Sequence, residues 1–108
     1  MPTVYITAPP STAEELSTAL VEERLAACVN HLPCTSTFRW EGEVVEEDEV
    51  VLLAKTPAVR YEALCDRVVE LHPYDVPCVE RFDETDVLEP FGERASDFAR
   101  ADDEYAHG

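Results

Sequence analysis

The order of strand-like and helix-like patterns along the chain restricts its fold more than any other feature. Apolar residues that alternate with polar ones predict strands, and apolar residues spaced three and four apart predict helices. The predicted strands cover residues 3–8, 35–40, 44–54 and 76–82, and residues 29–32 are also compatible with a strand. The predicted helices cover residues 13–28 and 57–71, with a weaker one at 87–98. The chain therefore has the order β-α-β-β-α-β with one more helix appended.

That order is typical of the ferredoxin-like α+β fold, in which helices cover one face of an antiparallel sheet. With 108 residues the chain is predicted to be a single domain, 1–108, with a frayed acidic tail at about 100–108. The other face of such a sheet would be left exposed to solvent. The hairpin predicted at 35–54 is too long to be fully paired within a domain of this size, so it would leave unpaired strand edges. Self-association is the simplest remedy, so we expect an oligomer.

Local signals predict where the helices begin and end. Ser11 and Glu14 fit a capping box at the start of the first helix. Thr12 and Glu15 fit a capping box that begins one residue later. Thr56 is expected to cap the second helix, with Pro57 at its first position. That helix is expected to end at His72, because the proline that follows cannot continue it.

The chain is strongly acidic, with 24 Asp and Glu against 8 Lys and Arg and a formal net charge of -16. Such a surface suits a protein kept soluble in concentrated salt, where screening makes self-repulsion tolerable, so we expect a halophilic source. An acidic protein that recruits cations or basic partners is the alternative. The lack of a basic stripe argues against nucleic acid as a partner. The acidic run 46–49 is interpreted as solvated surface rather than a cation site, since neighbouring carboxylates on a strand alternate faces.

The sequence predicts a cytoplasmic protein with no membrane segment. Its first residues lack a basic region followed by a long apolar core, and the longest apolar run, 50–54, is too short to cross a bilayer. Four cysteines lie far apart in the chain and are interpreted as reduced thiols: Cys28, Cys34, Cys65 and Cys78.

The segment Leu71-His72-Pro73-Tyr74-Asp75-Val76-Pro77 is the strongest local candidate for a site. Its two prolines make the chain rigid, and it presents His72 and Tyr74 at the boundary of a helix, where sites are often built. A helix stop with a tyrosine packed over it is the structural alternative.

Cys28 and His72 are the predicted metal ligands. Thiolates select Cu(I), and imidazole also binds Cu(II) and zinc, while a helix-end imidazole can also carry a proton. His31 and Cys34 lie three and six residues after Cys28, but strand alternation points His31 to the opposite face, so we do not expect these three side chains to hold one metal ion together. His31 is interpreted as a surface histidine and Cys34 as a small hydrophobic residue. Packing remains the alternative for Cys28, and a favourable contact with the helix dipole is the alternative for His72.

Trp40, Lys55 and Tyr74 are predicted to bind a ligand or to lie in a subunit interface. Trp40 offers a ring for stacking, although a tryptophan also suits an interface. Lys55 is the single lysine, which indicates a specific need for a compact ammonium. It would neutralise a carboxylate such as Glu41 or hold an anion between subunits.

No enzyme motif is present. The chain lacks a Ser-His-Asp order, a metalloprotease motif and a defensible pair of carboxylates, and its three glycines form no phosphate cradle. We therefore expect a binding protein and not an enzyme.

Four motifs occur together in a family-specific order and spacing: residues 20–30 (LVEERLAACVN), 40–42 (WEG), 55–56 (KT) and 72–77 (HPYDVP). They resemble the CutA family of divalent-cation tolerance proteins over about residues 4–80. The resemblance implies a homotrimer like the PII signalling proteins, cytoplasmic placement, binding of copper or another divalent cation, and no established catalytic reaction. The last helix departs from the family pattern, because residues 87–91 lack its tyrosine and tryptophan and contain Pro90.

Two functions follow as hypotheses. The first is a trimeric copper or divalent-cation tolerance protein that responds to metal ions, with its site in pockets between subunits. The alternative is a PII-like sensor or signalling trimer that holds a small anion between subunits, with Lys55 and Tyr74 at the pocket. Metal uptake that depends on thiols would favour the first, and anion binding that depends on Lys55 would favour the second.

Overall fold

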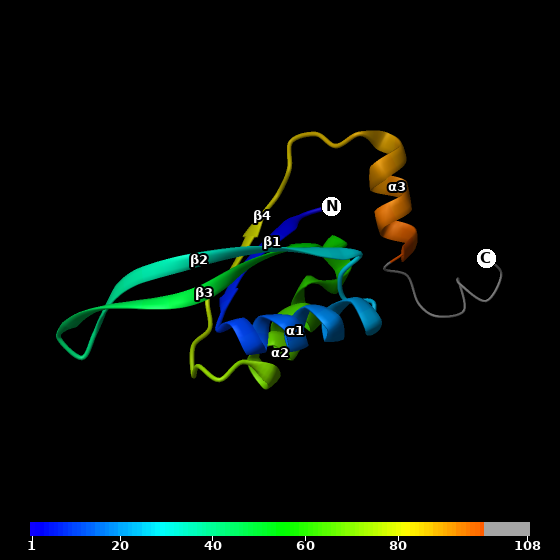
Figure 1. The fold of residues 1–108 in the computed structure, drawn as a ribbon. Helices are drawn as coiled ribbons and strands as arrows, with labels where there is room; N and C mark the ends of the chain where they lie inside the picture. Colours follow the sequence, from blue (N-terminus) through cyan, green and yellow to red (C-terminus); the bar gives the residue numbers. More distant parts are fainter. Residues whose placement is uncertain (99–108) are drawn as a thin grey trace.

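The computed structural model describes residues 1–98, which form one antiparallel sheet and three α-helices (Figure 1). The elements follow in the order β1 (Thr3–Ala8), α1 (Pro10–Glu22), β2 (Cys28–Trp40), β3 (Glu43–Lys55), a 3-10 turn (Ala58–Arg60), α2 (Tyr61–Leu71), β4 (Val79–Phe82) and α3 (Glu89–Phe98). The predicted β-α-β-β-α-β order with an appended helix is confirmed. The tail predicted to fray at 100–108 lies outside the described residues.

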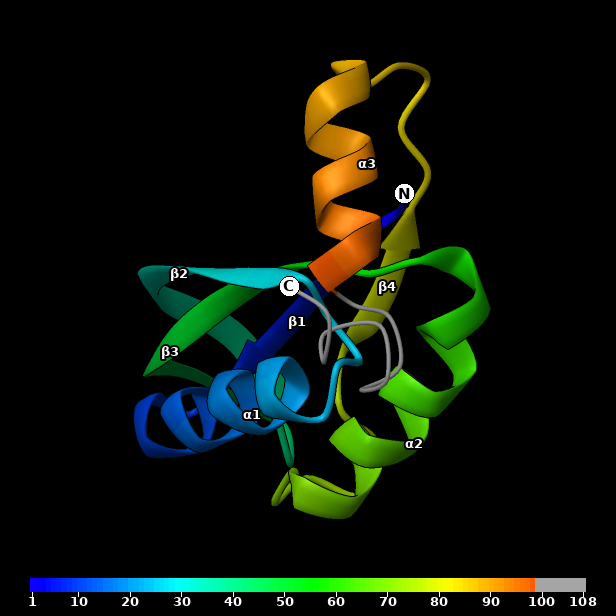
Figure 2. The same cartoon turned by 90° about the vertical axis from the view of Figure 1, so that its right-hand side faces the viewer.

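The sheet has the strand order β2-β3-β1-β4, and every neighbouring pair is antiparallel. The alternation of β1 explains which face is covered, since Val4, Ile6 and Ala8 are buried and the residues between them are only half-buried. Helices α1 and α2 both pack on that face (Figure 2). Their apolar residues complete the core, which includes Leu16, Leu20, Leu64 and Val68. The opposite side is the open face of the sheet.

Strands β2 and β3 continue far beyond the rest of the sheet (Figure 1). Strand β1 pairs with β3 only from Lys55 to Val50, whereas β2 pairs with β3 to the end of the hairpin, at Trp40 and Glu43. Residues 34–49 therefore form a two-stranded ribbon. This agrees with the prediction that the hairpin is longer than the rest of the sheet. Glu41 and Gly42 close the ribbon with φ of 49° and 84°, which suits a tight hairpin turn.

Helix α1 ends six residues earlier than predicted. Arg24 adopts a φ of 60°, and its N–H donates to the carbonyl of Val21 at 3.1 Å. The N–H of Leu25 donates to the carbonyl of Leu20 at 2.9 Å, which completes a Schellman motif. No glycine marks this helix end, so the apolar spacing that continues to Cys28 was misleading, and Cys28 begins β2.

Both predicted helix caps are wrong. Helix α1 follows Pro9 without any side-chain cap, so the predicted capping box is not formed. Pro57 precedes the 3-10 turn, and the turn shifts the start of α2 to Tyr61. Thr56 is fully buried, and within the described chain its hydroxyl has no hydrogen-bond partner. The tertiary position of Thr56 has overridden its local preference for a cap.

The predicted strand boundaries need two further corrections. Strand β2 runs through Pro33 without a break, because β2 is an edge strand and a proline is tolerated there. Strand β4 begins at Val79 rather than at residue 76, since the segment that contains both loop prolines stays irregular. Its place at the other edge of the sheet agrees with the expectation from Pro77.

Helix α3 lies on the other side of the sheet from α1 and α2 (Figures 1 and 2). It begins at Glu89, two residues later than predicted, with Pro90 in its first turn. Nη1 of Arg24 donates to the carbonyl of Phe98 at 3.3 Å and ties the end of α3 to the end of α1. Among the described helices, none has the length and apolar character needed to span a bilayer.

Candidate functional site

His72 lies at the end of α2 and is held by both ring nitrogens. Nε2 is 2.8 Å from the carbonyl oxygen of Thr7 on β1, and Nδ1 accepts the N–H of Tyr74 at 3.1 Å. Because Nδ1 accepts a hydrogen bond, the ring proton belongs on Nε2, where it is donated to Thr7. The imidazole is buried and fixes the start of the proline-rich loop to the sheet. The predicted end of the helix at His72 is thus confirmed.

Tyr74 continues this connection to β3. Its ring centroid is 4.6 Å from that of His72, with the ring planes tilted by 55°. Its hydroxyl donates to Oε2 of Glu49 at 3.4 Å. Burial raises the pKa of Tyr74, and the carboxylates of Glu49 and Glu47 raise it further. The loop is therefore attached through His72 to β1 and through Tyr74 to β3.

Glu49 was not anticipated as a site residue. The acidic run 46–49 is exposed as predicted at its first three positions, but Glu49 is only 7% exposed. Its burial reflects its place beside Tyr74, whose loop comes 25 residues later in the chain. Alternation along β3 places Glu49 on the open face of the sheet, together with the half-buried Lys55.

The open face gathers several more ionisable side chains. Burial raises the pKa of Tyr5, and Cys78, Cys34, Glu80 and Glu49 raise it further in that order. Burial also raises the pKa of the Cys78 thiol, with Glu80 as the next cause. The thiol therefore keeps its proton more firmly than a cysteine of ordinary pKa does, which weakens it as a metal ligand. The even spacing of Thr3, Tyr5 and Thr7 along β1 is the signal that could have placed Tyr5 here.

Cys28 and His72 are not brought together within one chain. Cys28 pairs with Lys55, which also pairs with Thr3 at one end of β1, whereas His72 binds Thr7 near the other end. Four residues of strand separate these two levels by about 13 Å. His31 is exposed, and alternation turns it to the other face from Cys28 and Cys34. Within residues 1–98, no group of three or more His, Cys, Asp or Glu side chains is placed to hold a metal ion.

Lys55 lies at the opposite end of β3 from the hairpin turn. Its Nζ donates to Oγ1 of Thr3 at 2.9 Å, and no carboxylate of residues 1–98 lies within ion-pair distance of it. The predicted pairing with Glu41 is wrong within one chain, because Glu41 lies beyond the far end of the thirteen-residue strand β3. That separation is about 40 Å. Among residues 1–98, Lys55 therefore has only a neutral partner.

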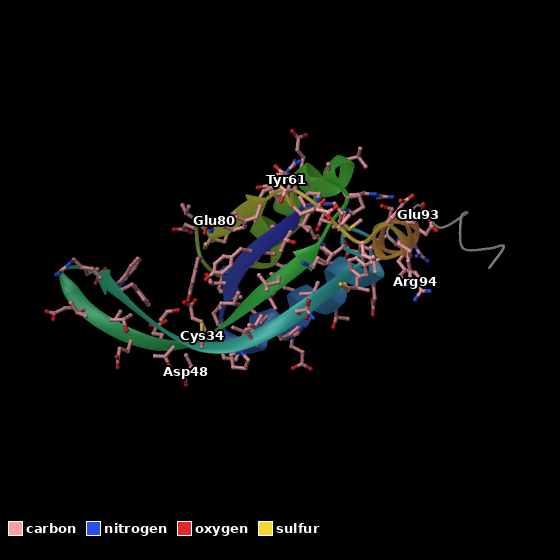
Figure 3. All side chains as sticks on the ribbon, turned by 90° about the horizontal axis from the view of Figure 1, so that it is seen from above. Cys34, Asp48, Tyr61, Glu80, Glu93 and Arg94 are labelled. Carbon is pink, nitrogen blue, oxygen red and sulfur yellow. The ribbon has the colours of Figure 1, made fainter. Side chains whose placement is uncertain are left out.

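Trp40 lies at the end of β2 beside the hairpin turn and is 64% exposed. Figure 3 views the molecule from above, with Cys34 and Asp48 near the base of the ribbon and α3, marked by Glu93 and Arg94, toward the other end. Trp40 pairs with Glu43, which lies twelve residues along β3 from Lys55 and six from Glu49, where the His72–Tyr74 loop contacts the strand. Trp40 is therefore remote from both His72 and Lys55 in its own subunit. Of the five predicted site residues, the described chain brings together His72 with Tyr74, whose rings are in contact, and Cys28 with Lys55, which are cross-strand partners.

The fold and these side chains define an α+β protein of the ferredoxin-like class, with ionisable groups on the open face of its sheet. Solved structures share this architecture: CutA of Pyrococcus horikoshii, crystallised in the presence of 3M guanidine hydrochloride, superposes with a TM-score of 0.89 at 38% identity, over 93% of this chain and 100% of that one. Residues 2–96 match the family described as the CutA1 divalent ion tolerance protein. The chain belongs to that family, which confirms the resemblance seen in its motifs.

Relatives and further structures agree with this assignment. The CutA divalent-cation tolerance protein of Thermus thermophilus is 54% identical over 76 residues, 68% of this chain and 74% of that protein. A CutA from Nostoc sp. PCC 7120, described as PII-like and solved in its apo form, has a TM-score of 0.87 at 32% identity, over 93% of this chain and 98% of that one. A CutA of Archaeoglobus fulgidus, described as periplasmic, has the same TM-score and identity, over 93% and 100% of the two chains.

Proposed function

We propose that this protein is a cytoplasmic homotrimer that binds copper or another divalent cation and contributes to tolerance of the ion. The observation that carries the proposal is the family match over residues 2–96, since the family is one of divalent ion tolerance. Copper is the preferred ion because the chain offers four free thiols, and thiolates favour Cu(I). The same free thiols are the reason for placing the protein in a reducing cytoplasm.

The two-stranded ribbon and the exposed apolar side chains of the single chain support the proposed trimer. Within residues 1–98 the ribbon has no third strand, and an isolated two-stranded ribbon is only marginally stable in water. Exposed apolar side chains lie on both the ribbon and the sheet edges, including Leu32, Val44 and Phe82. The likeness to a PII-like CutA supports a trimer as the form that covers these surfaces.

Cys28 and His72 are the ligands that we propose for the ion, although they do not converge within a subunit. Because residues 1–98 provide no three-ligand group, a complete site would have to combine groups from more than one copy. Cys28, half-buried at the start of β2, is the first candidate for such a shared site. His72 can bind an ion only if it gives up one of its two hydrogen bonds.

No catalytic role is part of the proposal. Both nitrogens of His72 are engaged in hydrogen bonds with the backbone, so its ring is a structural anchor rather than a free base. The raised pKa of the Cys78 thiol likewise argues against a nucleophile at that position.

A titration of the reduced protein with Cu(I), Cu(II) and Zn(II) tests the proposal, with the mass of the assembly followed by native mass spectrometry. We expect a trimer that takes up a stoichiometric amount of Cu(I), and we expect Cys28→Ser to lose this uptake. Cys65→Ser is the matched control, because Cys65 is also half-buried but lies on α2. An intact trimer that binds none of the three ions would overturn the metal proposal.

His72→Ala needs a control of its own, because loss of the ring also frees the loop. His72→Asn retains one donor and one acceptor near the same backbone groups. Loss of binding in both variants, with an unchanged circular dichroism spectrum, would support ligation by His72. Binding that survives in His72→Asn would show that the ring acts by holding the loop.

Lys55 favours a second candidate function, a PII-like sensor of a small anion. Its ammonium is half-buried and has no carboxylate partner within residues 1–98. A pocket completed by another subunit would let it hold an anion beside Tyr74 or Trp40. Calorimetry with inorganic phosphate and citrate, on wild type and Lys55→Gln, tests this function, and equal heats for the two proteins would reject it.

A further inference from the structure

Four side chains form a row across the open face of the sheet, at the end where β3 finishes. Cys28 pairs with Lys55, Lys55 with Thr3, and Thr3 with Phe82, so each of the four strands contributes one residue. Paired residues share a face, and Ala54 is buried under the helices, so the row lies on the open side. This row, called the Lys55 row below, places a thiol, an ammonium, a hydroxyl and an aromatic ring side by side.

Lys55 and Thr3 keep hydrogen-bond donors for a further partner. Nζ of Lys55 donates one of its three protons to Oγ1 of Thr3 at 2.9 Å, which leaves two. Because Oγ1 accepts that bond, the hydroxyl still has its own proton to donate. Two donor atoms 2.9 Å apart can bind the two oxygens of one carboxylate, and the charge of the ammonium strengthens such hydrogen bonds. The pair therefore suits a carboxylate.

The charge of the open face favours a ligand with a single negative charge. Among the strand residues within 1–98, Lys55 is the only cation on this face, because Arg39 and Arg81 occupy positions that face the helices. The whole chain carries a formal charge of -16. One ammonium balances one carboxylate, whereas any second charge on the ligand would be repelled by the acidic chain. A monocarboxylate is therefore favoured over phosphate or citrate.

Within residues 1–98, no carboxylate competes for this position. None lies within ion-pair distance of Lys55. The carboxylates close to Phe82 in the chain lie beside other groups: Glu80 beside the thiol of Cys78 at 3.7 Å, Asp83 beside Arg81 at 2.9 Å, and Glu84 beside the amino group of Met1. The Lys55 row can thus accept a carboxylate from solution.

Phe82 adds an apolar surface next to these donors. Its side chain is 55% exposed, and it lies on the strand beside Thr3, at a spacing of about 4.8 Å. A ring bonded directly to the carboxylate would extend across that spacing and lie against the phenyl ring. Contacts between aromatic rings are favourable beyond the area that they bury. The row therefore distinguishes a flat aromatic acid from an aliphatic one.

We propose that the Lys55 row binds a monocarboxylate carried directly on an aromatic ring, of the benzoate class. The carboxylate accepts hydrogen bonds from Nζ of Lys55 and from the hydroxyl of Thr3, and the ring of the ligand stacks on Phe82. This inference rests on the anion-sensing function proposed above and names its class of ligand. It also gives the single lysine of the chain a role that a neutral residue could not fill.

Calorimetry on the assembled wild-type protein, at one fixed chloride concentration, tests the class of ligand. Benzoate is the flat aromatic acid, cyclohexanecarboxylate has a similar size without a flat ring, acetate has the carboxylate alone, and benzamide has the ring without the charge. We expect benzoate to bind about tenfold or more tightly than acetate or benzamide. We expect it to bind about threefold or more tightly than cyclohexanecarboxylate.

Variants test each residue of the row, with circular dichroism as the check on folding. Lys55→Gln should weaken benzoate binding about tenfold or more, because it removes the charge. Arg81→Gln is the matched control, since it removes the same charge from β4 but on the other face, beside the ring of Tyr61. Thr3→Val should also weaken binding, and Thr3→Ser, which keeps the hydroxyl, should restore it. Phe82→Leu should abolish the preference for benzoate over cyclohexanecarboxylate.

The outcomes separate the class of ligand from the anion-sensing function itself. Benzoate binding that Lys55→Gln weakens and Arg81→Gln leaves unchanged supports the proposal. Benzoate that binds no more tightly than acetate, or equally well to Lys55→Gln, would overturn it. If phosphate or citrate bound in a manner dependent on Lys55 while benzoate did not bind, the anion-sensing function would stand and the benzoate class would be wrong. If none of these anions bound, both would be refuted.

Discussion

The hydroxyl of Tyr74 donates to the buried carboxylate of Glu49 at 3.4 Å. In the described chain this is the one side-chain hydrogen bond that reaches Glu49, whose neighbours on the ribbon are exposed. A buried carboxylate that loses its donor keeps the cost of its desolvation. The proline-rich loop therefore stabilises a charge on a distant strand as well as ending a helix.

Tyr74→Phe should lower the free energy of unfolding by about 1 kcal/mol, because the hydrogen bond is long and the tyrosine is partly exposed. Denaturant unfolding at one fixed protomer concentration measures this loss. Combined with Glu49→Gln in a double-mutant cycle, the effects of the two changes should not add. Strictly additive effects would show that the phenol and the carboxylate do not interact.

Alkaline pH should destabilise the protein through two phenols whose pKa is raised, those of Tyr5 and Tyr74. The pKa of Tyr5 is raised above the ordinary value of 10.0 by burial first and then by Cys78 and Cys34, and that of Tyr74 is raised by burial and Glu49. The folded chain thus holds these protons more tightly than the unfolded chain. Their contribution to stability is complete below pH 10 and is lost as the pH rises through the raised values.

Tyr5→Phe and Tyr74→Phe should each move the alkaline unfolding midpoint to higher pH. Phenolate absorbance and circular dichroism, recorded over the same pH series, separate ionisation from unfolding. If the wild-type phenols ionised near pH 10 while the chain stayed folded, the expected destabilisation would be refuted.

Features that depend on local pattern were predicted well. The alternation of Val4, Ile6 and Ala8 and the spacing of Leu16 and Leu20 determine which faces are buried, and these periods can be recognised in the sequence. The overreach of the hairpin followed from strand length alone. The proline that ends α2 at His72 acts on the residues beside it, so this boundary was also predictable.

Features that depend on distant contacts were missed. Arg24 takes a left-handed conformation that its residue type does not favour, and its guanidinium contacts Phe98, 74 residues later. Glu49 is buried by a loop that local pattern could not place beside it. The pairing of Lys55 with Glu41 failed because the two positions lie at opposite ends of one long strand, a distance that residue types alone do not reveal.

Thr56→Val should stabilise the protein by about 1 kcal/mol. The Thr56 side chain is fully buried, and its hydroxyl has no hydrogen-bond partner in the described chain, while valine has nearly the same shape. Thermal and denaturant unfolding measure the gain. Thr56→Ser is the control, because it keeps the hydroxyl, removes a methyl group and should destabilise. A loss of stability in Thr56→Val would show that the hydroxyl has a partner in the assembled protein.

Lowering the salt concentration should weaken the proposed trimer. Each chain carries a formal charge of -16, and bringing copies together concentrates that charge. The Debye length, beyond which exposed charges are screened from one another, is about 3 Å at 1 M salt and about 30 Å at 0.01 M. Repulsion between subunits therefore reaches further as salt is removed. Light scattering on the protein in a potassium chloride series, with sucrose substituted for salt as a control, distinguishes screening from a general stabilisation of burial.

A variant that neutralises the exposed ribbon carboxylates Glu46, Glu47 and Asp48 should remain associated at lower salt than wild type. A mass that stays trimeric from molar to millimolar salt would refute the dependence and, with it, the interpretation of the acidic surface as an adaptation to high salt.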